Sequence, residues 1–113
     1  MGRITSAVLL AGLIVTMGLA ASAAPSAAAQ PAVTVSIQNA QYSPATVTIK
    51  AGQTVLWTNN DDRDHTVVAA DGSFKSGNIG PGQSFTHTFG KPGRYKYACS
   101  YHPRMKGEVV VSE

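Results

Sequence analysis

The sequence predicts an all-β domain, an antiparallel β-sandwich or barrel built from about seven short strands. Three observations lead to this prediction. Apolar and polar residues alternate with a period of two in segments rich in β-branched and aromatic side chains, which is the pattern of half-buried strands. Turn-forming residues separate these segments at intervals of about 8 to 12 residues. After residue 30, no segment repeats its apolar residues at the 3.6-residue spacing of a helix.

The first predicted strand shows the alternation most clearly, with Val33, Val35 and Ile37 set against intervening polar residues. The predicted strands, in chain order, are residues 33–38, 46–50, 53–59, 65–70, 83–89, 93–99 and 107–113. The turns that separate them are rich in glycine and proline: Ser43-Pro44, Ala51-Gly52, Asp71-Gly72, Gly80-Pro81-Gly82 and Lys91-Pro92-Gly93. The larger aromatic side chains are expected to pack in the core or on a sheet face rather than to relay electrons: Trp57, Tyr95 and Tyr97.

Residues 1–29 are predicted to be a secretory signal peptide that precedes one domain, residues 30–113. Arg3 gives a positive start, residues 7–20 are apolar, and small residues follow at the spacing that signal peptidase requires. We expect cleavage between Ala29 and Gln30, because a cut after Ala24 would leave Pro25 first. The alternative is a retained membrane anchor, since residues 4–24 approach the roughly 20 residues of a spanning helix. The protein is therefore expected to be exported, to the periplasm or the extracellular space, free or anchored.

The charge balance excludes few partners but gives no indication of nucleic-acid binding. Without Arg3, the nine Lys and Arg become eight against six Asp and Glu, a net charge of +2. The chain has no run of basic residues and no aromatic platform for bases. We expect a monomer that contacts membranes only if the N-terminal segment is retained.

Cys99 is the only cysteine of the chain, so it cannot form a disulfide within it. An exposed thiol outside the cytoplasm would oxidise. One interpretation is therefore a buried, inert cysteine that packs as a small hydrophobic residue. The other is a metal ligand, because His102 follows three residues later and Met105 three residues after that. Pro103 stiffens the turn that would bring the three side chains to one point.

The chemistry of these donors indicates copper. Thiolate and thioether are soft ligands, and zinc rarely takes methionine. One thiolate and two imidazoles in a plane, with a weak axial methionine, form the blue-copper arrangement. The Cys99 loop supplies one imidazole, so the second must come from His65 or His87. We expect His65, which opens a predicted strand after a polar loop, whereas His87 lies mid-strand and is expected to be a core or edge histidine with a satisfied hydrogen bond.

From about Val33 to Glu113 the chain resembles the cupredoxins, and among them the amicyanins most. The segments DHTV, which holds His65, and YACSYHPRMKGEVVV carry the resemblance. The second contains the amicyanin spacing Cys-x2-His-Pro-x-Met. One departure is Asp64, where amicyanins usually carry a proline, and this puts the conformation of the His65 loop in question.

The resemblance implies a Greek-key β-sandwich of seven to eight strands that binds one copper ion, cycling between Cu(I) and Cu(II). The implied ligands are His65, Cys99, His102 and Met105. The resemblance also implies that the backbone N–H of Thr66 donates to the Cys99 sulfur and that the Thr66 side chain ties the two ligand loops together. His102 is then expected to lie near the surface, where the electron leaves.

These features predict a type 1 copper protein that carries single electrons between partner proteins, whose identity the sequence does not reveal. The alternative is an exported copper-binding protein for storage or delivery. We do not expect an enzyme, because four protein ligands leave no open position for a substrate. The charges beside the ligands are expected to form a solvated rim, with partner steering as the alternative: Arg94, Lys96, Arg104 and Lys106 on one side, and Asp61, Asp62 and Asp64 on the other.

Overall fold

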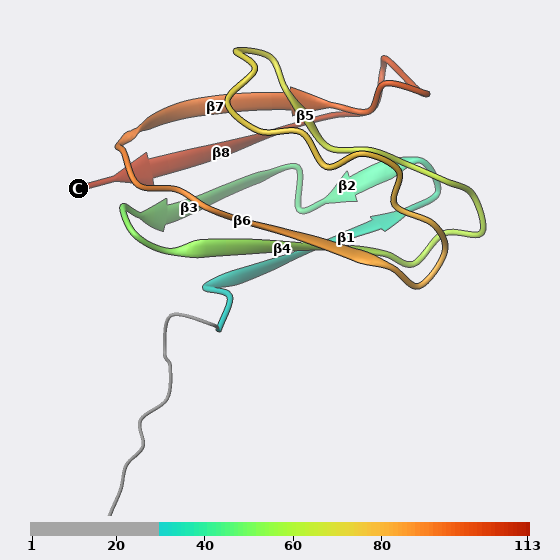
Figure 1. Ribbon diagram of the computed structural model, residues 1–113, viewed down its shortest axis with the longest axis horizontal. Coiled ribbons are helices and arrows are strands. Elements are labelled where there is room, and N and C mark those ends of the chain that lie inside the picture. Colours follow the sequence, from blue (N-terminus) through green and yellow to red (C-terminus); the bar gives the residue numbers. More distant parts are fainter. Residues whose placement is uncertain (1–29) are drawn as a thin grey trace, which may run out of the picture.

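The computed structural model describes residues 30–113, which form two facing β-sheets (Figure 1). The predicted signal segment, residues 1–29, lies outside the described residues. Among residues 30–113, no helix is long and apolar enough to cross a membrane. The strands are β1 (Val33–Gln38), β2 (Gln41–Ser43), β3 (Thr46–Lys50), β4 (Thr54–Asn59), β5 (Val68–Ala69), β6 (Ser84–Thr88), β7 (Gly93–Ala98) and β8 (Lys106–Ser112).

Each sheet has four strands, in the order β2-β1-β4-β6 in one and β3-β8-β7-β5 in the other. This confirms the predicted all-β sandwich. The sheets are mixed rather than purely antiparallel, because β1 runs parallel to β4 and β3 runs parallel to β8. The chain leaves the first sheet after β2, adds β3 to the second sheet and returns as β4 beside β1. Alternation along a strand shows which side chains are buried but not the direction of the neighbouring strand, so the sequence did not predict the parallel pairs.

Six of the seven predicted strands agree with the structure to within one residue at each end. The exception is the segment 65–70, where only Val68–Ala69 pair in a sheet and His65 forms an isolated bridge with Ile79. The backbone just before β5 is instead engaged by the loops of the site described below. Strand β2 was not predicted, because three residues are too few to show alternation.

The core lies between the two sheets, and Trp57 of β4 is at its centre. Trp57 is fully buried and packs against Phe85 of its own sheet and Tyr97 of the other, with ring centroids 5.6 and 5.4 Å apart. Burying a side chain of this size contributes about 1.5–3 kcal/mol or more. The prediction that Trp57 and Tyr97 are core residues is confirmed, and Tyr95 is half-buried against Phe89. This packing fixes the two sheets relative to each other, and with them the positions of the strand ends.

The fit of Tyr97 in the core depends on Gly107. The two residues are paired across β7 and β8. A Cβ atom on Gly107 would overlap the Cζ and hydroxyl oxygen of the Tyr97 ring. Tyr97 is 2% exposed, so the ring has little room to move away. The missing side chain at Gly107 therefore provides the space in which the tyrosine packs.

We predict that Gly107→Ala lowers the free energy of unfolding by about 1–3 kcal/mol, because the added methyl group overpacks the contact with Tyr97. Urea unfolding of the metal-free protein would measure the change. Gly90→Ala is the matched control, because a Cβ there meets no atom within 4 Å. It should change stability by no more than about 0.5 kcal/mol. Equal effects of the two substitutions would contradict the proposed contact.

Candidate metal centre

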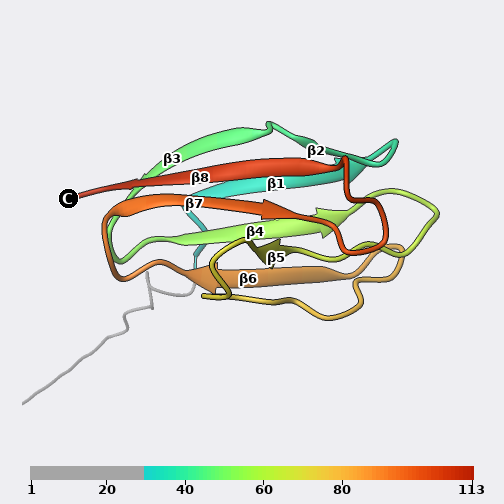
Figure 2. The same ribbon diagram turned by 90° about the horizontal axis from the view of Figure 1, so that it is seen from above.

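The predicted ligands come together at one end of the sandwich. His65 lies in the connection after β4, Cys99 directly follows β7, and Met105 directly precedes β8. Both ligand loops extend from the same end, which also holds the turn between β1 and β2, and the C-terminus lies at the opposite end (Figures 1 and 2). Residues separated by 34 positions along the chain therefore meet because strand ends of two packed sheets face one another.

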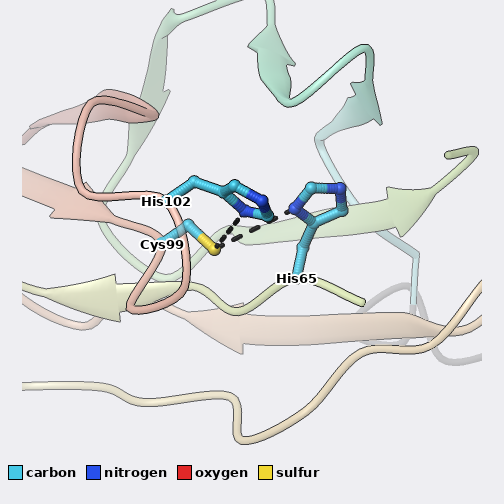
Figure 3. Close-up of side chains that lie close together, drawn as sticks. All are labelled: His65, Cys99 and His102. Carbon is cyan, nitrogen blue, oxygen red and sulfur yellow. Dashed lines mark hydrogen bonds between the residues drawn. The ribbon is translucent and has the colours of Figure 1, made fainter. Parts of the chain in front are cut away.

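Three side chains converge on one point at this end (Figure 3). The Cys99 Sγ lies 3.7 Å from the Nδ1 of His102 and 3.9 Å from the Nδ1 of His65. All three atoms lie within 4.8 Å of one another. Cys99 and His65 are buried, with 1% and 0% of their surface exposed, whereas His102 is half-buried. The structure thus places the donor atoms of three of the four predicted ligands close to one another.

These separations fit a shared metal ion. An ion about 2.3 Å from a thiolate sulfur and about 2.0 Å from an imidazole nitrogen, with a trigonal angle between them, places the two donors about 3.7 Å apart. The observed separations of 3.7 and 3.9 Å agree with this value. One thiolate with two imidazoles is also a soft donor set of the kind that copper prefers.

Met105 closes the loop that begins at Cys99. The backbone N–H of Cys99 donates to the carbonyl oxygen of Met105 at 3.1 Å, and the N–H of Met105 donates to the carbonyl oxygen of His102 at 2.8 Å. Met105 is 4% exposed. The loop is therefore the tight turn that the three-residue spacing predicted, with the thioether residue buried at its end.

Thr66 connects the two loops as the resemblance implied. Its backbone N–H donates to the Cys99 Sγ at 3.4 Å, and its Oγ1 lies 3.7 Å from the same sulfur. The Oγ1 also accepts a hydrogen bond from the N–H of Ser100 at 2.8 Å and lies 2.9 Å from the Ser100 Oγ. Thr66, which follows His65, thus holds both the Cys99 sulfur and Ser100 at the start of the second ligand loop.

The surroundings of Cys99 favour its thiolate. Burial raises the pKa of the thiol, but hydrogen bonds from His102, the Thr66 N–H, His65 and the Tyr101 N–H outweigh burial and lower the pKa to about 6. The bare protein therefore holds the form of cysteine that binds metals.

Asp61 holds the His65 ring at the nitrogen that faces away from the sulfur. The sequence analysis did not predict this role. The Nε2 of His65 donates to the Asp61 Oδ2 at 2.9 Å, so Nδ1 is the nitrogen that faces Cys99. The N–H of Ala40 donates to the same oxygen at 3.0 Å. The bond to His65, followed by the bond from Ala40, keeps the pKa of the Asp61 carboxyl well below its usual range. Three carboxylates lie within four residues of His65, and nothing in the sequence singled out the one that turns inward.

The His65 loop is ordered without the proline that amicyanins usually carry before the histidine. His65 exchanges two backbone hydrogen bonds with Ile79, at 3.0 and 2.8 Å. The buried Asn59 side chain donates to the carbonyl oxygens of Arg63 and Ile79, at 2.7 and 2.9 Å. Asp64 is exposed. The conformation that Asp64 put in question is thus stabilised by neighbouring backbone pairs.

His87 is not part of this cluster. It lies on β6 with its half-buried ring between Phe74 and Phe89, each with a centroid 4.7 Å away. Burial lowers its pKa. His87 is thus an edge histidine, as predicted, although the contacts that hold it are aromatic rather than the expected hydrogen bond.

Comparisons with known proteins agree on one family. Residues 9–111 match the family described as Cupredoxin-like domain. Amicyanin of Paracoccus versutus is 37% identical over 85 residues, which cover 71% of this chain and 64% of that protein, slightly less than two thirds of its length. Amicyanin-alpha of Methylorubrum extorquens is 36% identical over 118 residues, covering 98% and 99% of the two chains.

Solved structures agree with these relatives. A purple cupredoxin of Nitrosopumilus maritimus is 35% identical, with a TM-score of 0.67 over 71% of this chain and 99% of that one. A copper-containing nitrite reductase of Thermus scotoductus is 33% identical, with a TM-score of 0.72. That match covers 83% of this chain but only 25% of the reductase.

We predict that Asp61→Asn weakens copper binding by about 10- to 100-fold, because the amide no longer orients His65 as a charged acceptor does. Competition with a chelator would measure the affinity. Asp62→Asn is the control, because Asp62 is exposed in the same loop. Equal affinities for the Asp61 and Asp62 variants would show that the carboxylate does not support the ligand.

We also predict that the Cys99 thiolate of the metal-free protein persists at pH 7 and protonates as the pH falls through about 6. Ultraviolet absorbance of the thiolate would follow this titration. Since an unfolded thiol has a pKa of about 8.5, the free energy of unfolding should rise with pH between about 6 and 8.5. That gain is lost as the pH falls through the folded pKa. The rise should be absent in Cys99→Ser, and an identical slope in both proteins would refute the lowered pKa.

Proposed function

The chain belongs to the cupredoxin-like family and binds one copper ion, and we propose from this premise that it carries single electrons between redox proteins outside the cytoplasm. The metal ligands we assign are His65, Cys99, His102 and Met105. The observation that supports the assignment is the position of the Cys99 sulfur, 3.7 and 3.9 Å from two imidazole nitrogens. When bound, copper supplies a one-electron couple between Cu(I) and Cu(II).

The protein's own contribution is to keep the donors in place. Thr66 holds the sulfur through its N–H, and Asp61 holds the His65 ring through its far nitrogen. Donors fixed by neighbours on packed strand ends move little when the charge at the centre changes. Such rigidity favours rapid electron exchange over chemical conversion of a substrate.

Exposure distinguishes the two histidines. His65 is fully buried, whereas His102 is half-buried in the loop at the end of the molecule. We assign His102 as the edge that a redox partner contacts. The burial of Cys99 and His65 also supports electron transfer over the alternative, copper storage or delivery, because releasing the ion would require both loops to open.

We also propose that the protein is exported from the cytoplasm. We place cleavage between Ala29 and Gln30, which leaves the sandwich intact because β1 begins at Val33. Retention of residues 1–29 would instead anchor the protein to a membrane. We propose a monomer, since Tyr101 is the one large hydrophobic residue exposed between residues 30 and 113.

The ligand assignment predicts the behaviour of two variants of the copper-loaded protein. Cys99→Ser should lose the intense visible absorption of the Cu(II) form, because that absorption is charge transfer from the thiolate. Met105→Leu should keep the absorption but raise the reduction potential, since loss of the weak axial donor disfavours Cu(II). Visible spectra and voltammetry would measure both.

A Cys99→Ser protein that keeps its colour, or a Met105→Leu protein with an unchanged potential, would contradict the respective assignment. Reversible cycling with fast self-exchange in the unmodified protein separates an electron carrier from a delivery protein. A delivery protein would exchange electrons slowly and transfer its copper to an acceptor chelator.

A further inference from the structure

An open groove of about 900 Å³ lies directly beside the metal centre. Its lining includes His102 and Pro103 of the ligand loop, and Tyr42 of β2. A second groove of about 280 Å³ continues along β7 and β8 and shares Lys106 with the first. The residue that we assign as the contact point for partners therefore lines the first of two adjoining grooves.

This surface carries more positive than negative charge. Arg104 and Lys106 line the first groove, and Lys96 and Lys106 line the second. All three side chains are exposed. The ion pairs within residues 30–113 are Asp61 with His65 and Arg94 with Glu108. Glu108, the acidic residue of the second groove, pairs with Arg94 at 3.5 Å and lies opposite Lys96 across β7 and β8. Arg104 and Lys106 have no acidic partner among residues 30–113, so the surface keeps a net positive charge.

Tyr101 adds a fixed aromatic ring beside these charges. Its side chain is 51% exposed, and its hydroxyl donates to the Asn78 Oδ1 at 2.7 Å. That bond anchors the ring to the connection between β5 and β6. An exposed aromatic ring already held in one orientation loses little entropy when a protein covers it. Aromatic rings and arginine are also the residue types most enriched at the centres of protein interfaces.

We propose that this face docks a redox protein with an acidic surface patch, and the inference rests on the electron-carrier function proposed above. Tyr101 and Pro103 would form the apolar contact around His102. Carboxylates of the partner would lie against Arg104, Lys106 and Lys96. Opposite charges would increase the rate of encounter and orient the partner with its redox centre toward His102.

Nuclear magnetic resonance tests binding without requiring turnover. A plant-type [2Fe–2S] ferredoxin serves as an acidic probe, and cytochrome c as a basic one, each added to the ¹⁵N-labelled Cu(I) protein. We expect the ferredoxin to shift the amides of residues 96 and 101–106, and this effect to vanish at high salt. Cytochrome c should leave these amides unchanged. Shifts centred on the exposed residues 62–64, or none with ferredoxin, would overturn the proposal.

Stopped-flow kinetics tests the charges individually. The reaction passes one electron from reduced ferredoxin to the Cu(II) protein, which oxidises the iron–sulfur cluster and yields Cu(I). Arg104→Glu and Lys96→Glu should each slow the second-order rate about tenfold or more at low ionic strength, with the difference lost at high ionic strength. Lys50→Glu is the matched control, because it makes the same charge change at the end of β3. Lys50 pairs with Ser112, near the C-terminus and far from the ligand loops.

Equal slowing by the Lys50 and Lys96 substitutions would show that net charge acts rather than this face, and would overturn the proposal. Each variant is first checked for an unchanged visible spectrum and reduction potential. Lys96 lies within β7, outside the ligand loop, so its variant decides the question if Arg104→Glu alters the copper spectrum. An unmodified protein without a type 1 spectrum would refute the electron-carrier function, whereas normal spectra with salt-independent rates would refute only the docking face.

Discussion

The bond between Thr66 and the Cys99 sulfur is the constraint on which the rest of the site depends. Its donor is a backbone N–H next to His65, so the sulfur cannot move without moving the other ligand loop. The Thr66 side chain extends the same connection to Ser100. A further bond runs from the Tyr42 hydroxyl to the Thr66 carbonyl oxygen at 2.5 Å, which joins β2 to this point. One residue thus couples both loops to the sandwich, and the geometry of the donors follows from the packing of the sheets.

The metal centre is asymmetric, and the asymmetry separates its two tasks. On the Asp61 side of the cluster, the buried His65 ring is held by a carboxylate that also accepts the N–H of Ala40, which suits this side to fixing the ligands. The His102 side opens into a groove and carries the charges that lack partners. Under the proposed function, the rigid part of the site and the part that recognises a partner therefore lie on opposite sides. A partner in the groove would be separated from the buried Cys99 sulfur only by the His102 side chain, and it would not disturb the hydrogen bonds that hold the sulfur.

Most of the fold and much of the site could be predicted from the sequence, for identifiable physical reasons. Alternation located six strands, because each side chain of a half-buried strand reports its own burial. The spacing of Cys99, His102 and Met105 predicted a tight turn, because closely spaced donors need only local backbone geometry. The choice of His65 over His87 followed from its position at the start of a predicted strand after a polar loop, and the family resemblance agreed with that choice. The parallel pairs and the inward turn of Asp61 were not predicted. Both depend on contacts between two segments, and the sequence of neither segment by itself indicates that contact.

The bond that closes the ligand loop, from the Cys99 N–H to the Met105 carbonyl oxygen, has a consequence for how such proteins diverge. It leaves residues 100–104 outside the ladder of β7 and β8, so mutation there does not change strand register. Within this segment, Ser100 and His102 are committed to the centre, whereas Tyr101 and Arg104 face outward. Selection can therefore exchange the outward pair to suit a new partner while the inward pair keeps the donor geometry. In the proposed electron carrier, substitutions at these two outward positions would alter the surface that meets a partner and leave the metal ligands unchanged.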